Sequence, residues 1–169
     1  CDSYLWLTNG ITYTTSGTYT YTGVTPAGCF AYETLNLTIN NSSSSITYIT
    51  SCNSYTWNLV TYTNSGVYDY TTTNAHGCDS IATLNLVING SPVTPIITQP
   101  FATTLEVSNG PFAFYQWYRN NIAIVGATSP TLNVFQAGMY SIEVTSIEGC
   151  SSKSAGFPIG VTGINDQDL

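Results

Sequence analysis

The side chains of this chain that could do acid–base or nucleophilic chemistry belong to one histidine, nine carboxylate residues and five cysteines. The histidine, His76, lies in the stretch TTNAHGCDS, whose composition is typical of a turn. A general acid or base works within hydrogen-bond distance of its substrate, usually in a pocket. A related stretch nearer the N-terminus has Ala27 at the corresponding position. We therefore interpret His76 as a solvated turn residue.

Paired carboxylates would suit glycoside hydrolysis, in which one acts as acid and the other as base or nucleophile. The acids of this chain are scattered, and Asp2 and Asp79 correspond to Asn53 and Phe30 in the related copy. Glu143 lies between two apolar residues of an alternating segment, which predicts that it points to solvent. The motifs G-x-S-x-G, H-E-x-x-H and the P-loop do not occur in the sequence. We predict no catalytic residues and no enzymatic activity.

Metal binding is not expected either. Zinc sites use closely spaced Cys and His ligands, and the nearest approach to such spacing is His76 with Cys78, which have no companions. The D-x-D-x-D-G spacing of a calcium loop does not occur. We expect neither a metal ion nor an organic cofactor.

The N-terminal half of the sequence, which contains most of these residues, consists of two related copies. CDSYLW at 1–6 returns as CNSYTW at 52–57, and the Gly-Cys pair at 28–29 returns at 77–78. The offset between the copies falls from 51 to 49 residues. The second copy is therefore predicted to have lost two residues near 58–60, where a hairpin tolerates a change of length.

The duplicated opening predicts a structural turn. Asp2 is replaced by Asn53 in the second copy, an exchange that preserves an Asx-turn on the local backbone but would abolish acid chemistry. Trp6 and Trp57 recur at equivalent positions, as core anchors would.

Nearly every window predicts β-structure. GTYTYT (17–22), TLNLTI (34–39) and TLNLVI (83–88) alternate with a period of two, while strong helix formers are scarce. ITYIT (46–50) leads into Cys52. Its counterpart is missing before Cys1, so the first repeat is expected to lack that strand. Because the chain opens on a cysteine, we expect it to be a piece of a longer protein.

A Pro-rich stretch, SPVTP (91–95), precedes a different module. This module resembles an immunoglobulin-like sandwich, with TTLEV (103–107), YQWY (115–118), SPTLNV (129–134) and AGMYSIEV (137–144) as strands B, C, E and F. The resemblance implies that Trp117 is a core anchor and Tyr140 a tyrosine corner. The inter-sheet cysteines of antibody domains are replaced by Ile142 and by Leu105 or Val107.

The five cysteines allow more than one pairing. We expect Cys1–Cys29 and Cys52–Cys78, because a self-contained module explains why each pair is duplicated together. Cys29–Cys52 is a competing pairing. Cys150 would then be unpaired, and we interpret it as a free thiol, or one whose partner was lost, rather than as part of an intermolecular bond. Disulfides would indicate an oxidising compartment.

Charge excludes two classes of partner. Only 7% of the residues are charged, Arg119 and Lys153 are the only strong bases, and the net charge is -7. Nucleic-acid binding needs a basic surface, and an acidic membrane surface would repel this chain. No apolar run reaches the roughly 20 residues of a membrane span.

Aromatic residues leave two interpretations open. Thirteen Tyr and three Trp on a weakly charged surface are typical of modules that stack rings on sugars. Their recurrence at equivalent positions favours core and cross-strand packing.

The repeats, CDSYLW…GCFAYETLNLTI and CNSYTW…GCDSIATLNLVI, resemble tandem repeats of secreted surface proteins of Bacteroidetes. The third module resembles the Ig-like domain that precedes the sorting domain of their type IX secretion system, and VTGINDQDL (161–169) looks like the linker to that domain. Asp79-Ser80-Ile81 resembles the O-glycosylation signal of that phylum, which would place a glycan on Ser80.

The resulting prediction is an all-β chain of two small disulfide-stapled β repeats followed by an Ig-like β-sandwich. The expected boundaries are 1–40, 41–90 and 91–163, with a linker at 164–169. The resemblance implies an extracellular or cell-surface stalk, adhesin or fibre component. Its partners would be neighbouring modules or subunits, joined through strand pairing. The alternative is a carbohydrate-binding accessory module of a secreted hydrolase, with surface glycans as partners.

Overall fold

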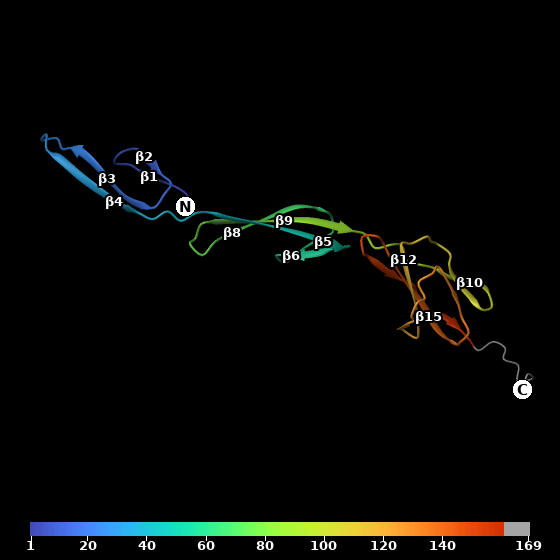
Figure 1. Ribbon diagram of the computed structural model, residues 1–169. Coiled ribbons are helices and arrows are strands. Elements are labelled where there is room, and N and C mark those ends of the chain that lie inside the picture. Colours follow the sequence, from blue (N-terminus) through green and yellow to red (C-terminus); the bar gives the residue numbers. More distant parts are fainter. Residues whose placement is uncertain (161–169) are drawn as a thin grey trace, which may run out of the picture. The chain divides into compact units, whose positions relative to one another are not determined.

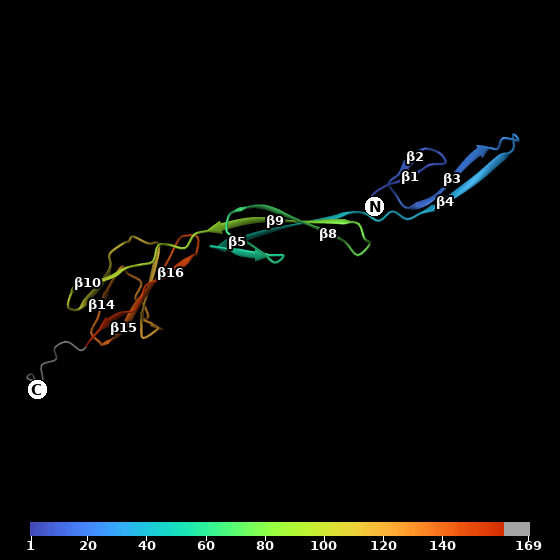
Figure 2. The same cartoon turned by 180° about the vertical axis from the view of Figure 1, so that it is seen from behind.

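The computed structural model describes residues 1–160, so the expected linker at 164–169 lies outside the described residues. The described chain contains seventeen β-strands and no helix (Figures 1 and 2), which confirms the all-β prediction. No helix able to cross a membrane is found in this part of the chain. Contacts divide it into two compact units, one formed by Cys1–Ile49 with Ser65–Val87 and the other by Thr50–Asn64 with the residues from Ile88 onward.

The first repeat consists of two hairpins. β1 (Tyr4–Trp6) pairs with β2 (Ile11–Tyr13), and β3 (Gly17–Val24) pairs with β4 (Phe30–Leu37) through eight matched positions. Both pairs form two-stranded sheets. Tyr and Thr alternate along β3 as the sequence predicts, because successive side chains of a strand point to opposite faces.

The first Trp of the repeat is a core anchor, as predicted. Trp6 is only 7% exposed. Its ring lies 6.2 Å from Tyr13 and 6.4 Å from Tyr21, and Tyr13 in turn lies 3.9 Å from Tyr19, all measured between ring centroids. In this repeat the recurring aromatics therefore pack against one another. Trp57 in the second repeat is half-buried.

The second repeat has the same two hairpins and one further strand. β6 (Tyr55–Trp57) pairs with β7 (Val60–Tyr62), while β8 (Gly66–Thr73) and β9 (Asp79–Asn89) form a sheet of order β5-β9-β8 with β5 (Ser43–Cys52). The β6–β7 hairpin turns through two residues, whereas β1 and β2 are joined by residues 7–10. The predicted deletion near 58–60 is therefore confirmed.

The C-terminal module is an Ig-like sandwich of two sheets. The first sheet contains β10 (Ile97–Phe101), β11 (Thr104–Val107) and β14 (Thr131–Asn133). The second has β12 (Phe114–Arg119) and β15 (Gly138–Thr145) at its centre, with β13 (Ile122–Ala123), β16 (Ser151–Lys153) and β17 (Phe157–Ile159) beside them. The strands expected as B, C, E and F correspond to β11, β12, β14 and β15.

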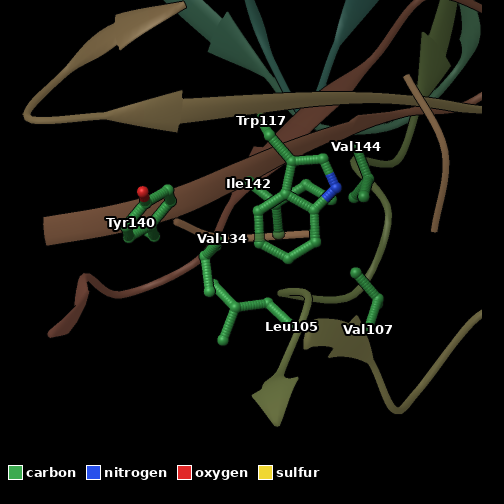
Figure 3. Close-up of a cluster of buried hydrophobic side chains, with 7 residues drawn as sticks. All are labelled: Leu105, Val107, Trp117, Val134, Tyr140, Ile142 and Val144. Carbon is green, nitrogen blue, oxygen red and sulfur yellow. The ribbon is translucent and has the colours of Figure 1, made fainter. Parts of the chain in front are cut away.

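Seven side chains fill the space between these sheets (Figure 3): Leu105, Val107, Trp117, Val134, Tyr140, Ile142 and Val144. Trp117 is fully buried, and its Nε1–H donates to the Ser129 carbonyl at 2.9 Å. The Tyr140 hydroxyl donates to the Gln136 carbonyl at 2.8 Å, which is the tyrosine corner. Leu105 and Ile142 are both fully buried, so an apolar pair occupies the place of the inter-sheet disulfide.

Candidate functional site

One disulfide joins the two repeats and the other joins the second repeat to the Ig-like module, so neither closes a repeat on itself. Cys1 is bonded to Cys78 and Cys52 to Cys150, while Cys29 is a free, exposed thiol. The predicted pairs Cys1–Cys29 and Cys52–Cys78, the competing pair Cys29–Cys52, and the predicted unpaired Cys150 are all wrong.

The length of the hairpins explains this correction. Cys29 lies just before β4, whereas the N–H of Asp2, next to Cys1, donates to the Asn40 carbonyl beyond the other end of that strand at 2.9 Å. Eight extended residues span about 25 Å, and a disulfide needs its Cα atoms within about 7 Å. The two cysteines of one repeat are therefore held at opposite ends of a long hairpin.

The first cysteine of each repeat begins a tight turn. The Ser3 N–H donates to the Cys1 carbonyl at 2.7 Å, and Ser54 does the same to Cys52. The residue between them has a left-handed backbone, with φ of 65° at Asp2 and 62° at Asn53. Asp and Asn tolerate this conformation better than most residues, which explains why these two types exchange here.

We predicted that the Asx side chain would bind its own local backbone. In the structure it binds a segment that is distant in the sequence. Asp2 Oδ1 accepts from the Ser42 N–H at 2.7 Å, and Asn53 Oδ1 accepts from the Ser91 N–H at 2.9 Å. The Asn53 N–H also donates to the Asn89 carbonyl at 2.8 Å, as Asp2 does to Asn40. Each Cys-Asx-Ser turn therefore holds the segment that leaves its own repeat.

The second cysteine of each pair lies at a hairpin tip, and this tip occurs three times, at 25–29, 74–78 and 146–150. In each tip the first residue donates its N–H to the cysteine carbonyl at 2.8 Å. The side-chain oxygen of that first residue lies 3.1 to 3.3 Å from the cysteine N–H nitrogen. The preceding glycine has a positive φ, of 79°, 76° and 85° in the three tips, which glycine adopts without steric cost.

Two of these tips are covalently joined to a Cys-Asx-Ser turn. Cys78 is 1% and Cys150 0% exposed. Their Sγ atoms lie 3.4 Å from the Asn40 carbonyl oxygen and 3.7 Å from the Asn89 carbonyl oxygen, respectively. The same junction therefore occurs twice. It consists of a Cys-Asx-Ser turn, the carbonyl of a residue at the end of the repeat (Asn40 or Asn89) and the hairpin tip of the following module. The sequence signal for this pairing is the third Gly-Cys pair, at 149–150, which the predicted pairs left unused.

The other residues singled out from the sequence do not converge on these junctions. His76 is exposed in the second tip, where its N–H donates to Asn74 Oδ1 at 3.0 Å. Within residues 1–160, no group of three or more His, Cys, Asp or Glu side chains could hold a metal ion. Ser80 is half-buried in the central strand β9, and its Oγ accepts from Ser43 Oγ at 3.0 Å.

Glu143 was predicted to point to solvent, and in the structure its carboxylate also accepts a hydrogen bond from a neighbouring strand. Tyr118 donates its hydroxyl to Glu143 Oε2 at 2.7 Å, and Lys153 Nζ lies 3.9 Å from the centroid of the Tyr118 ring. The hydrogen bond to Glu143, together with some desolvation and the carboxylate charge, raises the pKa of Tyr118 above its usual value of 10.0. These three side chains tie β12, β15 and β16 together on the outer face of the sandwich.

The Ig-like module also carries an open pocket of about 420 Å³. Its lining combines apolar side chains with Arg119, Asn120, Asn133 and Gln136. Phe135, which also lines the pocket, is 83% exposed. A lining that contains both amide groups and an exposed ring could take a small polar ligand.

No model of a protein family matches this chain, and no curated protein matches it. Among solved structures it is similar to one described as "Crystal structure of murine CEACAM1b". The identity is 16%, the TM-score is 0.35, and the match covers 64% of this chain and 67% of that one. A similarity at this level carries no argument about function.

Proposed function

We propose that this chain is a non-catalytic structural or adhesive part of a secreted or cell-surface protein, acting as a stalk of stapled modules. The observation that carries the proposal is the overlap of the two disulfides in the sequence. Cys52 lies inside the loop closed by Cys1–Cys78, and its own bond leads out to Cys150. A load applied along the chain would then be carried from each module to the next by a disulfide, and the long loops of the chain would stay unstretched.

The overlap limits how far the chain can be pulled out. The shortest covalent path from Cys1 to Cys150 crosses one disulfide, runs back along the chain from Cys78 to Cys52, a separation of 26 positions, and crosses the other disulfide. At about 3.5 Å per residue, this path extends to about 90 Å. In the reduced chain the same two residues are separated by 149 positions, and the chain between them would extend to about 520 Å.

An extracellular or outer cell-surface location belongs to the same proposal. Two disulfides favour an oxidising compartment, because cytosolic thiols are kept reduced. The resemblance of the repeats to type IX-secreted surface proteins of Bacteroidetes supports the same location. The partners proposed are neighbouring modules or subunits of the same protein.

Single-molecule force spectroscopy tests this proposal. The full chain is pulled by handles at its two ends, first oxidised and then in the presence of a reductant. We expect the extended length of the unfolded chain between residues 1 and 150 to rise from about 90 Å to about 520 Å on reduction. Equal lengths in the two conditions would contradict the proposal, and about 330 Å when oxidised would indicate bonds within each repeat.

The pocket of the Ig-like module supports a second candidate function, glycan binding as an accessory module. Phe135 is exposed and lines the same pocket as Asn120 and Gln136, whose amide groups could bind sugar hydroxyls. Tyr32 and Tyr48 are 75% and 77% exposed elsewhere. Retention on an insoluble polysaccharide or a glycan array, abolished by Phe135→Ala but not by Val125→Ala, would support this function. No retention on any glycan would exclude it.

A further inference from the structure

The free thiol of Cys29 occupies a position that is bonded in both other tips of the described chain. The tips at 25–29, 74–78 and 146–150 share their backbone hydrogen bonds and their positive-φ glycine. Cys78 and Cys150 are buried and each is bonded to the cysteine of a Cys-Asx-Ser turn. Cys29, in the same local geometry, is exposed and unbonded. The two disulfide-bonded tips indicate that the third tip could bond to the cysteine of another Cys-Asx-Ser turn.

Within residues 1–160, the first repeat also lacks a strand partner that the second repeat has. In the second repeat β9 lies between β8 and β5, whereas β4, the equivalent of β9, pairs only with β3 in the described chain. Leu84 and Leu86 of β9 are 0% and 3% exposed. The equivalent Leu35 and Leu37 of β4 are only half-buried. The outer edge of β4 therefore has free hydrogen-bonding groups and a partly uncovered apolar face.

We propose that Cys29 and the outer edge of β4 form one acceptor site for a further repeat of the same kind. The cysteine of that repeat's Cys-Asx-Ser turn bonds to Cys29. The strand that leaves it, equivalent to β5, pairs with β4 and continues into Cys1. The inference rests on the proposed stalk function and extends it, because it names the partner and the residue that the partner joins.

The covalent step is an ordinary thiol oxidation. The Cys29 thiol and the incoming thiol lose two protons and two electrons as the S–S bond forms. A disulfide oxidant, such as glutathione disulfide, accepts them and leaves as two thiols. The pattern also opposes a Cys29–Cys29 dimer, since each occupied tip is joined to a turn and neither is joined to another tip.

An extended chain tests the proposal. A copy of residues 52–89 followed by a copy of residues 41–51 is placed before Cys1 of the full chain, with the added copy of Cys78 replaced by serine. After refolding in a glutathione redox buffer, we expect Cys29 to lose its reaction with N-ethylmaleimide. Peptide mapping should then find Cys29 bonded to the added copy of Cys52. A matched control, in which that added cysteine is also replaced by serine, should leave Cys29 fully alkylated.

A second measurement keeps the test decisive if the extended chain folds poorly. Only the copy of residues 41–51, which has no cysteine, is placed before Cys1, and amide exchange of β4 is followed by mass spectrometry. We expect exchange in β4 to slow at least about tenfold relative to the unextended chain. Unchanged exchange, a reactive Cys29 in a folded extended chain, or Cys29–Cys29 dimers would overturn the proposal. If force spectroscopy still shows the short oxidised length, only this inference fails and the stalk proposal stands.

Discussion

Cys52 is joined to Cys150 across 98 residues, although Cys78 of its own repeat is much nearer in the sequence. Cys78 is instead joined to Cys1. Each repeat is thus connected through its first cysteine to the hairpin tip of the module that follows it. This stagger turns two short repeats and a sandwich into a covalently interlocked series.

Removing the second junction should destabilise the Ig-like module. The loop-entropy model assigns roughly 4.7 kcal/mol to closing a loop of this length, and measured losses run from about 2 to 5 kcal/mol. We expect the double variant Cys52→Ser/Cys150→Ser to lose an amount in this range in urea unfolding followed by Trp fluorescence. The control Cys29→Ser removes an exposed, unbonded thiol and should change stability by less than about 0.5 kcal/mol. Equal losses in the two proteins would contradict the assignment.

Asn53 should matter for its backbone conformation and its long-range hydrogen bond. Alanine at φ 62° is less favourable than Asn and cannot accept from the Ser91 N–H. We expect Asn53→Ala to cost about 1–2 kcal/mol. Asn53→Asp keeps the accepting oxygen and reproduces the residue found at Asp2, so it should cost much less. Thermal unfolding monitored by circular dichroism distinguishes them, and similar losses for both would argue against this role of the turn.

The β6–β7 hairpin contains a residue that its turn does not favour. Leu59 is fully exposed and has a φ of 66°, a conformation that suits glycine in two-residue hairpins. We expect Leu59→Gly to raise the free energy of unfolding by up to about 1 kcal/mol. Leu59→Ala, which removes the same exposed side chain but keeps the Cβ, should give no gain. A loss of stability in the glycine variant would show that the turn is formed differently.

Much of the fold follows from local patterns in the sequence. The alternation of TLNLTI and TLNLVI, the length change near residues 58–60 and the Trp117–Tyr140 core all depend on neighbours along the chain or on a recurrent sandwich pattern. The disulfide pairing depends instead on where the two ends of an eight-residue hairpin lie, which spacing in the sequence does not show. The third Gly-Cys pair, at 149–150, was the one sequence signal that pointed to the correct pairing.

The partners of the Asx side chains and of Glu143 could not be predicted from sequence patterns either, because they too depend on contacts between distant parts of the chain. The Asx side chains of the turns bind Ser42 and Ser91, which are 40 and 38 residues away, so no local turn rule could identify their partners. Glu143 follows the alternation that predicts an outward side chain, but its contact with Tyr118 depends on the register between β12 and β15.

Tyr118 should titrate above its usual pKa. Its hydroxyl donates to Glu143, which favours the protonated phenol in the folded state. A raised folded pKa means that this contribution to stability is fully present below about pH 10 and is lost as the pH rises through the folded pKa. A ¹³C NMR titration of the Tyr118 ring should show the raised pKa, and Glu143→Gln should lower it. A Tyr118 pKa at or below 10, or one unaffected by the substitution, would contradict the assigned cause.

The most direct test of the staggered junctions is disulfide mapping of the native chain. Free thiols are alkylated first, and the protein is then digested with pepsin at low pH, where disulfide exchange is suppressed because thiolates are scarce. The peptides are identified by mass spectrometry. We predict linked peptides containing Cys1 with Cys78 and Cys52 with Cys150, with the alkyl group on Cys29. Links of Cys1 with Cys29 and of Cys52 with Cys78, with the alkyl group on Cys150, would contradict the account.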